Sequence, residues 1–294
     1  MTLSARVTAQ AKINVLLRVL AREASGYHSI ETVFLRLDLG DDVRLRIADG
    51  AALDCSGPAV PAEGLGPVER NLAYRAAKAY SGATGWPRGF AIEIVKRIPV
   101  AAGLGGGSAD AGAVLRALDA MAPAPLGPRL IELAAPLGAD VAFMTIESPM
   151  AVAWGRGERL LPIRALDPRP TLVAIPDFGI PTADAYAWLA ADRGSCAPTA
   201  SVIALDSLAT WESLAVIAVN DFEPVVGRRY PVISELVSEL ASRDALLSML
   251  SGSGSAVFGV FADAPDADDV QGKTGTTMIV TRTSDRVARV LVER

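Results

Sequence analysis

The sequence predicts an α+β protein with two domains. Its 294 residues, 51% of them hydrophobic, suffice for one large domain or two ordinary domains with proper cores. Segments typical of strands and of helices follow one another along the chain, and the character of the sequence changes beyond the turn at residues 155–157. We therefore expect an N-terminal domain over residues 1–161, a crossing between domains over residues 161–170, and a C-terminal domain over residues 162–294.

Residues 1–161 are expected to combine strands with helices. Extended, largely apolar stretches predict strands over residues 6–20, 30–37, 43–47, 91–98 and 149–154, with a turn at residues 40–42 between the second and the third. Apolar residues at three- and four-residue spacing predict helices over residues 71–80, 108–121 and 129–137, the last of them closed by Gly138 as a C-cap.

Residues 162–294 show the same mixture. Strands are predicted over residues 171–175 and 278–283, and residues 249–261 read as a glycine-rich turn that runs into a strand. Helices are predicted over residues 182–189, 214–220, 232–242 and 266–271.

Composition and charge exclude several classes of protein. A formal net charge of −5 without a basic stripe argues against a protein that mainly binds nucleic acid. Cys55 and Cys196 lie far apart and resemble neither a disulfide framework nor a metal-binding knuckle. No apolar run is long enough to cross a bilayer, and the N-terminus lacks the design of a signal peptide. We expect a cytoplasmic protein that binds neither membranes nor nucleic acid.

The most unusual stretch is the glycine-rich segment after the strand predicted over residues 91–98. Four of the five residues from Gly103 to Gly107 are glycine, which is costly in ordered backbone because glycine loses the most conformational freedom on folding. A helical pattern begins directly afterwards, with Ser108 in the position of an N-cap. Backbone N–H groups that run into a helix N-terminus bind anions, most often phosphate. A flexible connection is the alternative, but the segment lacks the polar residues of a linker.

Two charged residues stand in apolar surroundings. Lys12 interrupts the first predicted strand, and Asp140 lies between Ala139 and the apolar residues 141–144. Buried charges are costly unless they are paired, so each predicts a partner. Lys12 could equally extend from a strand edge into water, and Asp140 could bind backbone N–H groups in a loop. Taken with the glycine-rich segment, one such cation and one such anion suggest a phosphoryl-transfer site.

The common nucleotide-binding motifs do not fit the chain. The P-loop is absent, because residues 272–274, Gly-Lys-Thr, lack the earlier glycine of that motif. The dinucleotide-binding fingerprint lacks its last glycine and would lie far from the N-terminus. The catalytic loop and the D-F-G triplet of protein kinases are missing. A Ser-His-Asp or Cys-His mechanism would have to use His28, the only histidine, but the sequence has no nucleophile elbow of the G-x-S-x-G type.

A series of motifs in order resembles one superfamily of small-molecule kinases. Residues 99–111, PVAAGLGGGSADA, closely resemble the phosphate-binding motif of the galactokinase, homoserine, mevalonate and phosphomevalonate kinase superfamily. The set AKINVLL (11–17), GYH (26–28), GADV (138–141), IPT (180–182), NDFEP (220–224) and SGSG (251–254) narrows the resemblance to the 4-diphosphocytidyl-2-C-methyl-D-erythritol kinases of the non-mevalonate isoprenoid pathway. The resemblance implies an N-terminal domain like the second domain of ribosomal protein S5, a C-terminal ferredoxin-like domain, and an active site in the cleft between them.

The resemblance implies phosphorylation of the 2-hydroxyl group of 4-diphosphocytidyl-2-C-methyl-D-erythritol by ATP, with Mg²⁺. Lys12 and Asp140 would be the catalytic pair: Asp140 would accept the hydroxyl proton, and Lys12 would hold Asp140 ionised and orient the hydroxyl. The implied ATP site consists of Asn71, Lys96 and the loop residues Pro99, Val100, Ala101, Ala102, Gly103, Leu104, Gly105, Gly106, Gly107, Ser108 and Ala109.

The resemblance also implies a site for the cytidine diphosphate group of the acceptor. Tyr27 and Tyr186 would sandwich the cytosine ring, and His28 would read its edge. Asn14 and Thr182 would contact the acceptor nearer the transferred phosphoryl group. Two rival functions stay open, a sister kinase for mevalonate- or homoserine-type alcohols and a nucleotide-binding regulatory protein without catalysis. The expected oligomeric state is a monomer or a weak homodimer.

One residue departs from the pattern of the family. The family often has proline after Gly-Ala-Asp-Val, whereas this chain has Ala142. The loop expected to carry Asp140 is therefore predicted to be less stiff, with activity retained.

Overall fold

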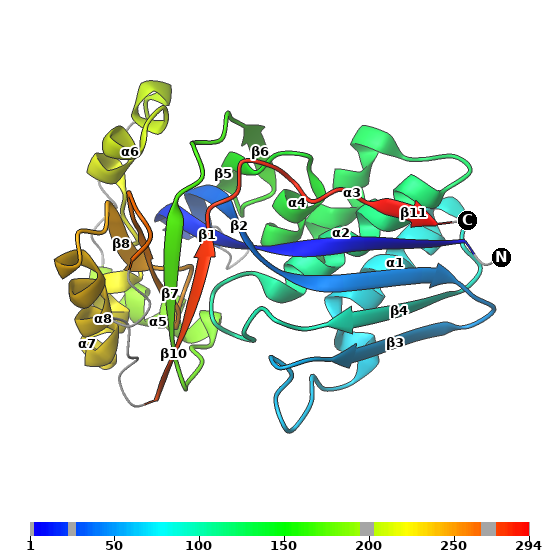
Figure 1. Ribbon diagram of the computed structural model, residues 1–294, viewed down its shortest axis with the longest axis horizontal. Helices are drawn as coiled ribbons and strands as arrows, with labels where there is room; N and C mark the ends of the chain where they lie inside the picture. Colours follow the sequence, from blue (N-terminus) through cyan, green and yellow to red (C-terminus); the bar gives the residue numbers. More distant parts are fainter. Residues whose placement is uncertain (1–2, 23–27, 195–202, 266–274, 294) are drawn as a thin grey trace.

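The computed structural model describes residues 3–22, 28–194, 203–265 and 275–293, which contain two β-sheets with their helices (Figure 1). The larger sheet has seven strands and the smaller sheet has four. Two α/β layers of this kind confirm the predicted α+β class. In the described part of the chain, no helix combines the length and the apolar character needed to cross a bilayer.

The larger sheet is built around a long pair of antiparallel strands, β1 (Ser4–Arg22) and β2 (His28–Ile47). Its main path runs β11-β1-β2-β4-β3, and β5 and β6 extend it from the other part of β2. All neighbours are antiparallel except β3 and β4. The remaining strands are β3 (Ala51–Ser56), β4 (Phe90–Val95), β5 (Met150–Gly155), β6 (Arg159–Pro162) and β11 (Leu291–Glu293).

Four helices cover one face of the larger sheet (Figure 1). They are α1 (Leu72–Thr84), α2 (Gly106–Met121), α3 (Leu130–Ala134) and α4 (Ala139–Thr145). α2 is buried along most of its length because small residues, mainly alanine, let β1, α1 and α4 approach it closely. The closest approach is at Gly112, where an added Cβ would lie 2.6 Å from the Cβ and the carbonyl carbon of Met144. α2 and α4 are therefore fitted to each other at this point.

The smaller sheet has the strand order β10-β7-β9-β8 and carries the remaining helices. Its strands are β7 (Pro170–Pro176), β8 (Leu247–Leu250), β9 (Val257–Val260) and β10 (Thr276–Arg282). The helices are α5 (Thr182–Arg193), α6 (Trp211–Ile217), α7 (Glu223–Arg229) and α8 (Pro231–Ser242). The buried side chains of Leu17, Val19 and Ile30 from β1 and β2 belong to the same hydrophobic cluster as α7 and α8, so the two sheets share core residues.

Several predicted elements differ from the structure. The turn predicted at residues 40–42 is wrong, because β2 runs through it as one strand with shifts in its register to β1. An added Cβ at Gly40 would lie 2.6 Å from Cγ2 of Thr8, so glycine is needed here for close strand contact. The helix predicted over residues 129–137 is α3 between two short 3₁₀ turns. The elements β3, β6, β8, β11 and α7 were not predicted. The helix predicted over residues 214–220 is α6, which begins and ends three residues earlier, and the helix predicted over residues 266–271 lies outside the described residues.

Two helix starts also differ from expectation. The N-cap of α2 is Gly105 in the left-handed conformation, so Ser108 lies in the first turn and is not the cap. Asp140 lies in the first turn of α4, with Gly138 as the N-cap of that helix, and not in a loop. Gly138 does end the preceding 3₁₀ turn, so it serves both elements.

The last strand returns to the beginning of the chain. β11 pairs with residues 4–6 of β1, and the main-chain N–H of Ser284 donates to the carbonyl of Arg36 in β2. The division at residues 161 and 162 stays a prediction, with the addition that residues 291–293 belong to the larger sheet.

Glycine-to-alanine substitution is expected to have opposite effects in two helices. Gly112→Ala in α2 should lower the free energy of unfolding by about 1–3 kcal/mol, because the new methyl group meets the α4 backbone. Gly82→Ala in α1 has open space around its Cβ and should raise that free energy by about 0.5–1 kcal/mol. Urea unfolding of both variants gives the two values, and the same sign for both would contradict the packing described here.

Candidate active site

A cleft of about 1570 Å³ lies between the glycine-rich segment, α4, α5 and the turn that precedes β9. It exceeds the ~300–1,000 Å³ usual for one drug-sized ligand and has room for two ligands side by side. Most of the expected site residues line it: Lys12, Asn14, His28, Asn71, Lys96, Pro99 to Ser108, Asp140, Thr182 and Tyr186. Ala109 is buried behind the loop and Tyr27 lies outside the described residues.

The glycine-rich segment is held in a defined shape from two sides. From β1, the N–H of Lys12 donates to the carbonyl of Leu104 at 3.0 Å. From the second glycine-rich turn, the hydroxyl of Ser251 donates to the carbonyl of Gly103 at 3.1 Å. The backbones approach so closely that a Cβ at Gly103 would lie 2.2 Å from the carbonyl oxygen of Ser251. A plain flexible connection is therefore wrong for this segment.

The end of the segment leaves room for Lys12 and for a ligand. Gly105 has φ of 72°, and a Cβ there would lie 3.0 Å from Cγ of Lys12 and 3.1 Å from Cε of Met144. α2 starts directly afterwards and has 16 residues, and its first N–H groups lack partners within the helix. A glycine cradle beside such a helix start, which lines the cleft, fits a phosphate group.

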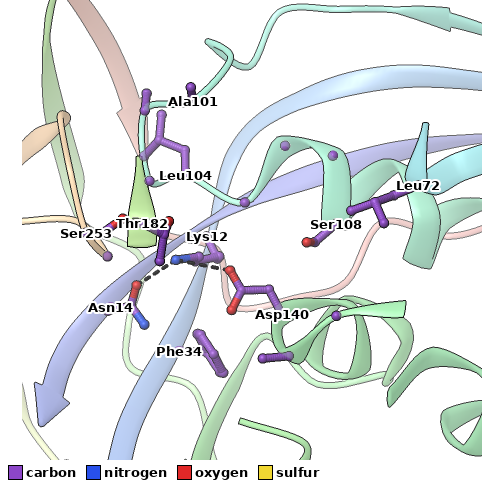
Figure 2. Close-up of a pocket in the computed structure, with 18 of the residues that line it drawn as sticks. Lys12, Asn14, Phe34, Leu72, Ala101, Leu104, Ser108, Asp140, Thr182 and Ser253 are labelled. Atoms are coloured by element: carbon purple, nitrogen blue, oxygen red, sulfur yellow. Dashed lines mark hydrogen bonds and ion pairs between the residues drawn. The ribbon is translucent and has the colours of Figure 1, made fainter. Parts of the chain in front are cut away.

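Lys12 and Asp140 meet at the middle of the cleft. The Lys12 ammonium lies 3.3 Å from Oδ2 of Asp140 and donates to Oδ1 of Asn14 at 2.6 Å (Figure 2). The ammonium is almost fully buried, and the carboxylate is 30% exposed toward the cleft. Lys12 is therefore a paired buried cation and not one extending from a strand edge, and the carboxylate can still reach a ligand.

Asn14 is fixed by the strands on which it lies. It follows Lys12 by two residues in β1, so both side chains lie on the same face of the sheet. Its amide group donates to Oγ1 of Thr32 at 2.8 Å, and that hydroxyl donates to the carbonyl of Leu16. This chain of hydrogen bonds orients the carbonyl oxygen of Asn14 toward Lys12. The Phe34 ring, 5.7 Å from the Lys12 ammonium, completes the wall.

Lys96 belongs to a second buried charge cluster at the other end of the glycine-rich segment. Its ammonium contacts Oδ2 of Asp41 and lies 2.6 Å from Oδ2 of Asp110 in α2. Asp41 also accepts from the N–H groups of Arg97 and Ile98. Asn71 caps α1 by accepting from the N–H of Ala73. Asp41 and Asp110 were not singled out in the sequence, although Asp110 is an acid in a largely apolar helix.

The environment of Asp110 changes its acidity. Burial, and then the neighbouring Asp41 carboxylate, raise the pKa of Asp110 to about 7 against the opposing effect of Lys96. Its second oxygen has no hydrogen-bond partner among the described residues. Burial raises the ionisation cost more than one ammonium shared by two carboxylates can offset.

Aromatic rings gather at the opposite end of the cleft. The rings of His28 and Tyr186 are stacked with centroids 4.6 Å apart, and Phe222 stands edge-on to Tyr186 at 4.9 Å. His28 therefore lies against a face of Tyr186. Thr182, at the start of α5, shares a hydrogen bond of 3.0 Å with Ser253. Phe222 and Ser253 line the cleft without having been assigned a role from the sequence.

The arrangement has two functional ends around one ion pair. The glycine cradle can hold phosphate, the aromatic end can hold a planar ring, and the Asp140 carboxylate between them can accept a proton. No group of three histidine, cysteine, aspartate or glutamate side chains suited to a metal ion occurs in the described part of the chain.

Comparisons with known proteins identify the proteins that this chain resembles. The GHMP kinases N terminal domain family matches residues 71–153, and the GHMP kinases C terminal family matches residues 204–278. A 4-diphosphocytidyl-2-C-methyl-D-erythritol kinase of Pelotomaculum thermopropionicum is 37% identical over 94% of this chain and 96% of its own length. The enzyme of that name from Gloeobacter violaceus is 38% identical over 98% and 96%. A crystal structure of 4-(cytidine 5'-diphospho)-2C-methyl-D-erythritol kinase, 34% identical, superposes with a TM-score of 0.76 and covers 95% of this chain and 98% of that one.

The raised pKa of Asp110 predicts a pH dependence of stability. The folded protein binds the Asp110 proton more tightly than the unfolded chain, so the free energy of unfolding should fall as pH rises from the ordinary pKa of 3.8 to about 7. Asp110→Asn removes this contribution, so its stability relative to the parent should increase from pH 5 to pH 8. Urea unfolding at several pH values measures the difference. Asp54→Asn, at an exposed site on β3, is the control, and a pH-independent difference for Asp110→Asn would contradict the prediction.

Proposed function

Because this chain belongs to the 4-diphosphocytidyl-2-C-methyl-D-erythritol kinases of the GHMP kinase superfamily, we propose that it transfers the γ-phosphoryl group of ATP to the 2-hydroxyl of 4-diphosphocytidyl-2-C-methyl-D-erythritol, in the formation of isoprenoid precursors. The observation that carries the chemistry is the Lys12–Asp140 pair, 3.3 Å apart beneath the glycine-rich segment. It lies where the acceptor hydroxyl must meet the donor phosphate.

In the proposed reaction, Asp140 accepts the proton of the 2-hydroxyl as the oxygen attacks the γ-phosphorus. Lys12 lies beside the carboxylate and supplies a positive charge near the transferred group. Catalysis of phosphoryl transfer depends mainly on such positioning and charge stabilisation. Asn14 holds Lys12 at 2.6 Å, and we place Asn14 and Thr182 against the acceptor near its reacting hydroxyl.

The donor end would hold the ATP phosphates in the glycine cradle and at the start of α2. The loop residues from Pro99 to Ala109 would enclose the phosphates, and Asn71 and Lys96 would line the adenosine pocket. Mg²⁺, when bound with ATP, would neutralise phosphate charge. The described residues offer it no dedicated cage, so phosphate oxygens would supply most of its ligands.

The acceptor end would bind cytosine at His28 and Tyr186. His28 now covers one face of Tyr186, so a base stacked on that face would displace the His28 ring, and we propose that His28 then reads the edge of the base. Tyr27 would close the sandwich, and its role stays a sequence prediction. Small alcohols such as mevalonate or homoserine have no ring for this end of the cleft, which favours the cytidine diphosphate substrate over a sister kinase activity.

The proposal also covers the cellular location, the oligomeric state and the binding partners of the enzyme. We infer a cytoplasmic enzyme that acts as a monomer or a weak homodimer and binds neither nucleic acid nor membranes. The net charge of −5 supports the absence of nucleic-acid binding.

Incubation of the protein with ATP and the proposed acceptor tests the reaction. Phosphorus NMR should show a new phosphomonoester in step with ADP formation, while mevalonate and homoserine should give no product. Turnover of mevalonate or homoserine, with none of the cytidine substrate, would overturn the assignment.

Asp140→Asn is expected to abolish turnover and to leave ATP binding nearly intact. The amide has the shape of the carboxylate but cannot accept the hydroxyl proton. An ADP-coupled assay measures turnover, and calorimetric titration with ATP measures binding. Equal loss of turnover and ATP binding would indicate a purely structural role for Asp140.

Tyr186→Ala is expected to raise KM for the acceptor and to leave KM for ATP unchanged. Loss of one stacked base contact costs about 1–3 kcal/mol, which corresponds to roughly 5- to 150-fold in KM. Tyr186→Phe keeps the ring and should behave like the parent. A similar rise of KM for both substrates in Tyr186→Ala would place the effect on the fold and not on the base.

A further inference from the structure

Arg36 is the largest of the fully buried side chains, and it is 2% exposed. It lies in β2, and no role follows for it from the reaction chemistry. Burial lowers the pKa of Arg36 to about 9, so the guanidinium remains a cation at neutral pH. A buried cation of this size needs strong hydrogen-bond partners to be tolerated.

The partners of Arg36 are the main-chain carbonyls at the end of α4. Its Nη2 donates to the carbonyl of Phe143 at 2.9 Å and to that of Ile146 at 3.2 Å, and its Nε donates to the carbonyl of Ser148 at 3.2 Å. The guanidinium also lies over the Phe143 ring, 4.9 Å from its centroid. The last carbonyls of a helix lack partners within it and carry partial negative charge, so a cation there stabilises the helix end.

α4 is held at its other end by the strand next to Arg36. Lys12 in β1 is the direct cross-strand partner of Arg36, and directly opposite residues of a sheet point to the same face. Lys12 contacts Asp140 in the first turn of α4, whereas Arg36 contacts carbonyls in its last turn and just beyond it. Two cations at one position of the sheet therefore contact the two ends of one helix.

The length of α4 makes these end contacts important. A helix of seven residues is too short to be stable by itself, so its position depends on what it packs against. A shift or rotation of α4 would move the Asp140 carboxylate relative to Lys12 and to the glycine cradle. Misplacement of a reacting group by about 1 Å can reduce the rate about 100-fold.

We propose that Arg36 is a positioning residue for phosphoryl transfer: by capping the C-terminal carbonyls of α4, it fixes the Asp140 carboxylate against Lys12 and the acceptor hydroxyl. The inference rests on the proposed role of Asp140 as the base. Arg36 itself is buried and is not among the residues that line the cleft.

The test compares Arg36→Met, Arg36→Lys and the control Leu45→Ala. Arg36→Met keeps much of the volume and loses every hydrogen bond to the carbonyls, whereas Arg36→Lys keeps the charge without the planar fork. Leu45 is fully buried in the same strand, where it pairs with β1 and β4, and its truncation destabilises the core without removing the cap of α4. Kinetics are measured well below the unfolding midpoint of each variant.

We expect kcat of Arg36→Met to fall about 10- to 100-fold, with KM for ATP unchanged. Arg36→Lys should show a smaller but measurable fall, and Leu45→Ala should keep the parental kcat. In hydrogen exchange, amides of residues 141–147 should exchange faster in Arg36→Met than in Leu45→Ala.

Parental kcat in both Arg36 variants, or an equal fall in Leu45→Ala, would overturn the inference. If Arg36→Met does not fold, Arg36→Lys decides alone, and a parental kcat in it overturns the inference. Asp140→Asn separates failure of the proposed base from failure of the proposed role of Arg36. Activity in Asp140→Asn contradicts Asp140 as the base. An inactive Asp140→Asn together with fully active Arg36 variants contradicts only the role of Arg36.

Discussion

The ion pair of Lys12 with Asp140 is the interaction on which the rest of the structure depends. A nearly buried ammonium is tolerated only with charged and polar partners around it. β1 supplies Asn14 two residues away, α4 supplies the carboxylate, and Gly105 leaves space for the lysine stem. Each of these elements is held by another: α4 by the close contact at Gly112, and the glycine-rich segment by the turn before β9. The geometry of the proposed catalytic pair thus depends on the packing of both sheets.

The sequence predicted the residues that carry the chemistry of the site better than the buried residues that hold them in place. Lys12, Asp140 and the glycines were recognisable because each is unfavourable in its local surroundings without a partner, and the structure brings them together. Asp41 and Asp110 were missed because pairing with Lys96 depends on contacts across 55 and 14 residues, which no local pattern reveals. In the sequence, Asp41 falls in the predicted turn at residues 40–42 and Asp110 near the start of the helix predicted over residues 108–121, where acids are common.

In the fold, too, elements set by local sequence patterns were predicted, whereas elements set by contacts between distant residues were not. Long apolar stretches and regular helical spacing predicted β1, α1, α2 and α8, because burial and periodicity are local properties of the chain. The prediction was wrong where it placed a turn at residues 40–42, inside β2, and where it placed Asp140 in a loop and not in the first turn of α4. Gly40 is typical of a turn in its local sequence, but it lies inside β2, where it allows close contact with Thr8 of the neighbouring β1 strand. β11 has three residues, too few to show a pattern.

The pairing of β11 with the start of β1 also has a consequence for biosynthesis. During translation, residues 4–6 of β1 are made almost 290 positions before the β11 residues that pair with their outer edge. An uncovered strand edge can pair with other chains. Until β11 is made, this short edge therefore has no partner strand within the nascent chain and is open to pairing with other chains.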